Sequence, residues 1–99
     1  IKDYIESNYC TNIRISMFAE KYFFSQEYLN KLFKNKYGFT IYEYVLKLRM
    51  ERAAELLAQP DIKISDIAER LGYADNHYFS KAFRNYYQLT PTEYRKGLG

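Results

Sequence analysis

The stretch ISDIAERLGYADNHYFSKAFRNYYQLTPTEYRK, residues 64–96, decides the fold of this chain. Its apolar residues first fall three and four positions apart, which is the spacing of one face of a helix. Gly72 then supplies a residue suited to a tight turn, after which the helical period resumes. A short helix, a turn and a longer helix with a common apolar side make a helix-turn-helix unit. Its expected core residues are Ile67, Ala68, Leu71, Tyr73, Phe79 and Phe83.

The same plan occurs once more, earlier in the chain. Ser16 and Ser65 lie 65 − 16 = 49 residues apart, whereas Tyr28 and Tyr78 lie 78 − 28 = 50 apart. The further pairs are Ile15/Ile64, Ala19/Ala68 and Glu20/Glu69 at 49, then Lys31/Lys81, Phe33/Phe83, Asn35/Asn85, Tyr37/Tyr87, Thr40/Thr90, Glu43/Glu93 and Tyr44/Tyr94 at 50. We expect the extra residue to lie in the turn between the two helices of each unit. The expected core residues of the first unit are Phe18, Ala19, Tyr22, Phe24, Leu29 and Phe33.

The whole chain has the pattern of an all-α protein with about seven helices. Apolar residues keep the helical period between the few proline and glycine residues, and no alternating run suits a strand. The expected helices are residues 1–10, 16–22, 26–37, 41–58, 65–71, 76–86 and 91–96. Thr40 with Glu43, and Thr90 with Glu93, have the spacing of capping boxes at two helix starts. Pro60 then ends the long helix.

Length and composition fit one small domain with a real core, because 47% of the 99 residues are hydrophobic. We expect a first helix-turn-helix subdomain over 1–39, a linker helix over 40–58 and a second subdomain over 59–99. A start at Ile1 suggests that more of the protein lies upstream. Because Cys10 is the single cysteine, and no signal peptide or membrane span is present, we expect a cytoplasmic protein.

The second helix of each unit carries amides, hydroxyls and cations on its polar side. One such helix alone would be read as an ordinary solvated face. Two of them with the matching pairs Lys31/Lys81 and Lys34/Arg84 favour contact with base edges and phosphates of DNA. The net charge of +3 agrees with an anionic partner.

An enzyme is not indicated. His77 is the only histidine, and it lies far in sequence from Cys10. No metal-ligand cluster and no phosphate-binding glycine loop occurs, so we expect no catalytic residue, no metal and no cofactor. We read His77 as a groove contact or a plain surface residue. The alternative function is a helical protein-interaction module, for example one that contacts RNA polymerase, without DNA specificity of its own.

Residues 64–96 resemble the signature segment of the AraC/XylS family of bacterial transcription regulators. The segments FAEKYFFSQEYLNKLFKNKYGFTIYEYV (18–45) and LKLRMERAAELL (46–57) are also similar to that family. The resemblance implies two helix-turn-helix subdomains joined by a long helix, each placing a recognition helix in one of two successive major grooves of double-stranded DNA. It also implies an effector or dimerisation domain before this segment, and RNA polymerase as a further candidate partner.

The resemblance assigns roles to individual positions. The implied base contacts are Gln26, Glu27, Asn30, Lys31, Asn76, His77, Ser80 and Lys81. The implied phosphate contacts are Ser25, Lys34, Arg49 and Arg84. Two positions depart from the pattern: Glu27 either reads a cytosine amino group or caps its helix, and Phe23 stands in the turn where the second unit has Gly72.

Overall fold

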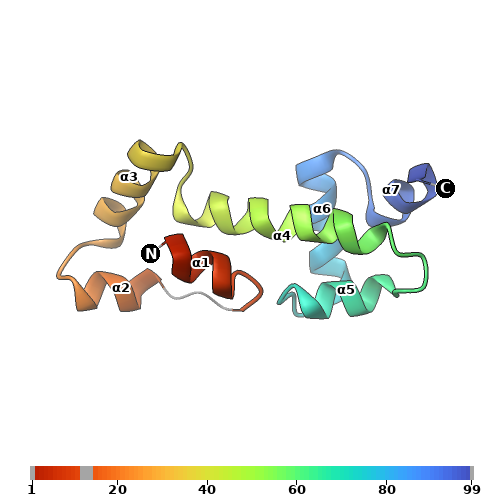
Figure 1. Ribbon diagram of the computed structural model, residues 1–99, viewed down its shortest axis with the longest axis horizontal. Coiled ribbons are helices and arrows are strands. Elements are labelled where there is room, and N and C mark those ends of the chain that lie inside the picture. The colour runs from red at the N-terminus through yellow and green to blue at the C-terminus, as the bar shows by residue number, and fades with distance from the viewer. Residues whose placement is uncertain (1, 12–14, 99) are drawn as a thin grey trace. The chain divides into compact units, whose positions relative to one another are not determined.

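The computed structural model describes residues 2–11 and 15–98, except for the side chains of Ile15 and Phe18. All regular structure in this part of the chain is helical, as predicted, and Figure 1 traces seven helices in chain order. They are α1 (Lys2–Asn8), α2 (Ile15–Lys21), α3 (Gln26–Tyr37), α4 (Ile41–Leu57), α5 (Ile64–Arg70), α6 (Asn76–Tyr87) and α7 (Pro91–Leu98). Each predicted helix therefore exists; α3 has the predicted ends, and the ends of the other helices differ by at most two residues.

The chain forms two compact units, Ile1–Leu48 and Arg49–Gly99, and the division between them falls inside α4. The first half of α4 belongs to unit 1 and the second half to unit 2. Unit 1 thus consists of α1, α2, α3 and the start of α4, and unit 2 of the end of α4 with α5, α6 and α7. The limits at residues 39 and 59, which treat the helix as a separate linker, stay a prediction.

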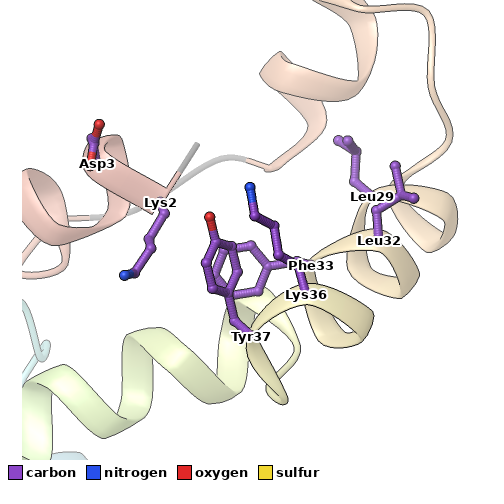
Figure 2. Close-up of a pocket in the computed structure, with 7 residues that line it drawn as sticks. All are labelled: Lys2, Asp3, Leu29, Leu32, Phe33, Lys36 and Tyr37. Atoms are coloured by element: carbon purple, nitrogen blue, oxygen red, sulfur yellow. The ribbon is translucent and has the colours of Figure 1, made fainter.

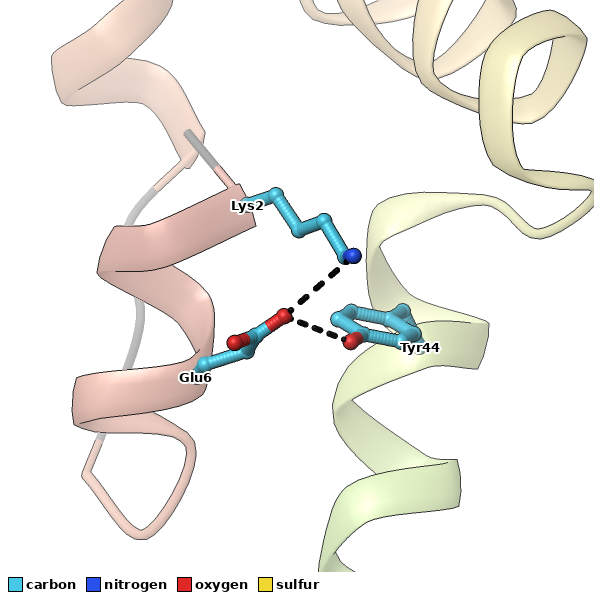
Figure 3. Close-up of polar contacts among 3 residues, drawn as sticks. All are labelled: Lys2, Glu6 and Tyr44. Carbon is cyan, nitrogen blue, oxygen red and sulfur yellow. Dashed lines mark hydrogen bonds and ion pairs between the residues drawn. The ribbon is translucent and has the colours of Figure 1, made fainter.

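The core of unit 1 lies between α1, α3 and α4. Its buried residues are Ile5, Phe33, Ile41 and Val45, with Tyr9, Leu29, Tyr37, Tyr44 and Leu48 packed around them. A polar contact adds to this packing at the surface, where the hydroxyl of Tyr44 donates to Oε1 of Glu6 at 2.9 Å. The Nζ of Lys2 lies 3.5 Å from the same oxygen (Figure 3). The bond from Tyr44 joins the first half of α4 to α1, whereas the ion pair of Lys2 with Glu6 lies within α1.

The expected core of unit 1 is only partly correct. Ala19 and Phe33 are buried and Leu29 is half-buried, whereas 52% of Tyr22 and 43% of Phe24 are exposed. The predicted burial of these two aromatic residues is therefore wrong, and the side chain of Phe18 lies outside the described part. Each ring lies against an exposed neighbour: Phe24 against Tyr28, with 5.2 Å between ring centroids, and Tyr22 against Lys21, whose Nζ lies 5.5 Å from the ring centroid.

Unit 2 has the larger supply of apolar side chains, because the second half of α4 contributes four. The buried residues of this unit are Met50, Ala53, Leu56 and Leu57 in α4, Ile67 and Ala68 in α5, Leu71 after it, and Phe79 and Phe83 in α6. Every expected core residue of this unit is buried except Tyr73, which is half-buried. The ring of Tyr73 lies against Phe79, with 5.6 Å between centroids.

The two helix-turn-helix turns begin alike. In unit 1 the N–H of Phe24 donates to the carbonyl of Ala19 at 2.9 Å. In unit 2 the N–H of Tyr73 donates to the carbonyl of Ala68 at 3.0 Å. Four residues (22–25) then separate α2 from α3, whereas five (71–75) separate α5 from α6. The change of repeat shift from 49 to 50 therefore lies in this turn, as predicted, and Ala74 is the additional residue.

Each unit uses two positions with positive φ, and each has glycine at only one of them. Phe23 (φ 61°) and Gly72 (φ 87°) are equivalent positions in the turns. Gly38 (φ 84°) and Gln88 (φ 65°) are equivalent positions that end α3 and α6. The left-handed conformation costs other residues energy that glycine does not pay. The same backbone path is thus kept in both units with different side chains.

Reciprocal hydrogen bonds start α4 and α7. The N–H of Thr40 donates to Oε1 of Glu43 at 2.9 Å, and the N–H of Glu43 donates to Oγ1 of Thr40 at 3.2 Å. Thr90 and Glu93 make the same pair of bonds at 2.9 and 3.1 Å. Both predicted capping boxes are therefore confirmed. The bonds from threonine hold the pKa values of both glutamates below their ordinary 4.5.

Candidate nucleic-acid interface

The helix α3 presents the candidate residues of unit 1. Ser25 caps its start, because the Ser25 Oγ accepts a bond of 3.0 Å from the N–H of Tyr28. Gly38 ends it in the left-handed conformation. The exposed candidate residues between these two caps are Gln26, Glu27, Lys31 and Lys34. Because Ser25 supplies the cap, Glu27 is left as an acid in the first turn, where the helix dipole favours a negative charge.

The helix α6 is the counterpart of α3 and has the same length of 12 residues. Asp75 caps its start, accepting a bond of 3.1 Å from the N–H of Tyr78. The exposed candidates are Asn76, His77, Lys81 and Arg84. Ser80 is half-buried, and its hydroxyl donates to Oδ1 of Asn76 at 3.5 Å. In contrast to α3, the first turn of α6 contains no acidic residue.

A hollow of about 540 Å³ gathers four of the unit 2 candidates on one side of α6. It is lined by His77, Ser80, Lys81, Arg84, Asn85 and Thr90. The lining holds two cations and several hydrogen-bond donors but no carboxylate. Such a surface suits hydrogen-bond acceptors, either the charged phosphates or the O6 and N7 atoms of guanine. Sequence reasoning did not assign Asn85 and Thr90 to this surface, although both are repeat partners, of Asn35 and Thr40.

Asn30 differs from the other candidates in unit 1. It is half-buried, and its Oδ1 accepts a hydrogen bond of 3.1 Å from the N–H of Ile41. The Asn30 side chain therefore connects α3 to the first residue of α4. Its predicted contact with a base stays a prediction.

Two predicted phosphate contacts also have structural partners. The Oγ of Ser25 is the cap acceptor of α3. The guanidinium carbon of Arg49 lies 5.1 Å from the centroid of the Tyr73 ring, a cation–π contact. Arg49 belongs to α4 and does not line the hollow beside α6. Lys34 is exposed on α3 and Arg84 is exposed on α6.

A second hollow, of about 510 Å³, lies on the other flank of α3 (Figure 2). It is lined by Lys2, Asp3, Leu29, Leu32, Phe33, Lys36 and Tyr37. The Tyr37 ring has the Nζ of Lys2 at 5.1 Å and that of Lys36 at 5.4 Å from its centroid. At 100° per residue, Leu32 and Lys36 point well away from Glu27 and Lys31 on this helix. This hollow is thus separate from the candidate nucleic-acid surface.

The described residues hold neither a metal-binding cluster nor a membrane-spanning helix. They contain no group of three or more histidine, cysteine, aspartate or glutamate side chains that could hold a metal ion. Over the same part of the chain, no helix has the length and apolar character needed to cross a membrane.

Comparison with known proteins gives a consistent result. The profile of a helix-turn-helix domain family matches residues 18–97. The Msm operon regulatory protein of Streptococcus mutans is 38% identical over 98 residues, covering 99% of this chain and 35% of that protein. The chain thus spans about a third of the length of this curated relative.

Solved structures agree with the sequence comparison. The C-terminal domain of the two-component response regulator YesN from Fusobacterium nucleatum superposes with a TM-score of 0.85 at 38% identity, over 95% of this chain and 92% of that one. A transcriptional regulator with an AraC-type DNA-binding domain from Chromobacterium violaceum gives 0.79 at 30% identity, over 98% and 87%. The chain therefore belongs to the AraC/XylS family of transcription regulators, and it is a helix-turn-helix DNA-binding domain of that family, not an enzyme.

Proposed function

We propose that this domain reads double-stranded DNA by placing α3 and α6 in two successive major grooves. The proposed base contacts are Gln26, Glu27, Asn30 and Lys31 on α3, and Asn76, His77, Ser80 and Lys81 on α6. The proposed phosphate contacts are Ser25, Lys34, Arg49 and Arg84.

The repetition of one exposed surface carries this proposal. Both helices have 12 residues, a side-chain cap at the start and a lysine at the same position, Lys31 in α3 and Lys81 in α6. A cation follows three residues later in each, Lys34 or Arg84. A single polar helix face would need no explanation beyond solvation. Two equivalent faces that share this pair of cations fit two similar ligands, which the major grooves of one duplex provide.

The chemistry of the side chains assigns roles within each face. Lys31 and Lys81 can donate to O6 and N7 of guanine, and an amide such as Gln26 suits adenine. Glu27 can accept from the amino group of cytosine, the one base edge in the major groove that offers only a donor. Arg84 and Lys34 lie one turn further along and suit the phosphates beside the groove. The two half-sites therefore differ in sequence, and one domain reads an asymmetric site.

The larger relatives suggest the role of the domain in the whole protein. Since the chain spans about a third of the curated relatives, we propose that another domain supplies effector binding or dimerisation. RNA polymerase is the proposed partner through which DNA binding alters transcription. A relative named as an operon regulatory protein supports a role of the whole protein in transcription regulation.

A salt titration tests the proposal. The preferred site is first selected from random duplexes, and its affinity is then measured by fluorescence anisotropy between about 50 and 200 mM salt. Two units that neutralise roughly 6–10 phosphates give a log–log slope of about −5 to −9. A slope near zero would contradict DNA binding and favour a protein-interaction module instead.

A further inference from the structure

We infer that Asn30 is a positioning residue whose side-chain oxygen holds the start of α4 and whose amide nitrogen reads DNA as a donor. The role of Asn30 at the start of α4 rests on contacts within unit 1. Its role in reading DNA rests on the proposed function. The inference follows from the bond of 3.1 Å between the N–H of Ile41 and Oδ1 of Asn30.

The orientation of the Asn30 amide is fixed by chemistry. A backbone N–H can pair only with an acceptor, so the atom facing Ile41 must be the oxygen and not the nitrogen. Ile41 is fully buried, and it is the first residue of α4, where no preceding helical carbonyl is available to its N–H. Leaving this N–H unpaired would cost the desolvation of a buried donor. The side chain therefore has one favoured orientation, with Nδ2 on the opposite side.

The second unit differs from the first at both of these positions together, and this difference supports the positioning role of Asn30. The equivalents of Asn30 and Ile41 are Ser80 and Pro91, each 50 residues later. Pro91 is also buried and also begins a helix, but proline has no N–H to satisfy. Where this donor is absent, the asparagine is absent too, and the shorter Ser80 donates to Asn76 on its own helix. Each unit thus has a matched pair at the same place.

The bond restricts how Asn30 can recognise a base. An asparagine that selects adenine uses both ends of its amide, with the oxygen accepting from N6 and the nitrogen donating to N7. With one lone pair of its oxygen engaged by Ile41, Asn30 offers the groove chiefly its Nδ2 donors. Asn30 therefore favours a base edge with an acceptor and does not demand adenine. Ser80, at the equivalent place in α6, carries no such restriction.

A double-mutant cycle tests the structural part without DNA. Asn30→Ser leaves the Ile41 N–H unpaired and lowers the melting temperature by about 4–8 °C, the shift expected for one such bond in a domain of this size. In the background of Ile41→Pro, which recreates the pair of unit 2, the same Asn30→Ser change costs much less. Equal losses in both backgrounds would overturn the positioning role.

Site selection tests the reading part, with Asn30→Asp as the decisive variant. Aspartate keeps the acceptor for Ile41 and suits a helix start, so the melting temperature is maintained. It lacks the donor, so the base preference falls at one position of the site while the others are unchanged. Asn35 is exposed on the same helix. Asn35→Asp adds the same negative charge and is therefore the control for general repulsion between the domain and DNA.

The outcomes separate the two proposals. Loss of preference at one base with Asn30→Asp but not with Asn35→Asp supports the donor role. A strict requirement for adenine at the base that Asn30→Ser relaxes would overturn it, as would identical selected sites for Asn30→Asp and the unchanged domain. If the unchanged domain selects no site at all, the proposed function fails, and the melting cycle still decides the role of Asn30 at α4.

Discussion

The Nε–H of Arg95 donates a hydrogen bond of 3.1 Å to the carbonyl oxygen of Leu57, the last residue of α4. The Nη2 of the same guanidinium donates at 3.0 Å to the carbonyl of Gln59. These carbonyls lie where a helix end leaves acceptors without intrahelical donors. One side chain of α7 thus satisfies the end of α4 within unit 2. In unit 1 the equivalent of Arg95 is Val45, which is buried.

Arg95→Ala is expected to destabilise unit 2 by about 1–2 kcal/mol, because two carbonyls lose a charged donor. The measurement is urea denaturation followed by circular dichroism. Arg95→Lys should recover only part of the loss, since an ammonium lacks the planar fork that reaches both oxygens. Lys96→Ala, at an exposed neighbouring position, is the control. Equal stability of the Arg95 and Lys96 variants would show that the contact is unimportant.

Glycine at the non-glycine positive-φ positions should stabilise the domain. Phe23→Gly is expected to gain about 0.5–1 kcal/mol, because 95% of the side chain is exposed and its removal costs no packing. Gly38→Ala should lose about 1 kcal/mol for backbone reasons alone, because no atom lies within 4 Å of the added Cβ. Thermal unfolding of both variants checks the signs. A less stable Phe23→Gly variant would mean that the exposed ring contributes to folding.

The capping boxes predict a stability change at acid pH. The folded pKa of Glu93 lies below its ordinary 4.5, because the Thr90 backbone and side-chain bonds favour the carboxylate. Its contribution is therefore complete above pH 4.5 and is lost as the pH falls through the lowered folded pKa. Glu93→Gln keeps an acceptor without this titration. The stability of this variant, measured by urea denaturation, should fall less than that of the unchanged domain over that pH window.

Lys81 and Arg84 are expected to differ in their effect on DNA binding. Lys81→Ala should relax base preference in one half of the site and cost about 1–3 kcal/mol on the preferred sequence. Arg84→Ala should weaken binding to all sequences about equally and reduce the salt slope by about one. Competition binding against mutated sites separates these effects. If Arg84→Ala changed the preferred bases and Lys81→Ala did not, the two assigned roles would be reversed.

Half-site spacing tests whether both recognition helices bind one duplex at once. Inserting five base pairs turns one groove to the opposite face of the DNA, so affinity should fall toward that of a single half-site. A proline at Arg52, inside α4, costs about 3 kcal/mol or more and should make binding weak and insensitive to spacing. Gel-shift assays with both duplexes measure this. Undiminished affinity of the unchanged domain for the five-base-pair insertion would contradict the two-groove proposal.

Much of the fold could be predicted because local signals and the repeat agreed. The turn residue Gly72, the cap pairs and the apolar period each predicted the same boundaries in unit 2. The buried residues of unit 1 were harder to predict from the sequence. Phe24 occupies the position equivalent to Tyr73 in the repeat, but it has no counterpart of the residues that pack over Tyr73. Tyr73 lies beneath Arg49, a contact between residues 24 positions apart that no local pattern encodes. The ring of Phe24 lies against Tyr28, which is itself exposed and leaves 43% of Phe24 open to solvent.

The candidate interface divides in a similar way. Exposed positions such as Lys81 follow from helix periodicity, since the polar side of an amphipathic helix faces outward. The hydrogen bond of Asn30 could not be read from α3, because its partner begins the next helix, 11 residues later. A hint lay in the repeat, where Pro91 replaces Ile41 as Ser80 replaces Asn30. Two positions that change together between the repeats therefore indicate a contact between them, which the similarity of the repeats does not.

Because α4 is shared between the two units, this domain is a tandem repeat in which each unit, here called a member, uses part of a common helix. The helix that closes the first member opens the second, and α7 corresponds to the first half of α4 through Glu93/Glu43 and Tyr94/Tyr44. Such an array is extendable in principle, because each member needs only its neighbour's helix to complete its core. Continuing α7 with the apolar positions of residues 50–57 would create the opening helix of a third member. If each unit reads one groove, as proposed above, this extension would lengthen the DNA site of one chain by about one groove.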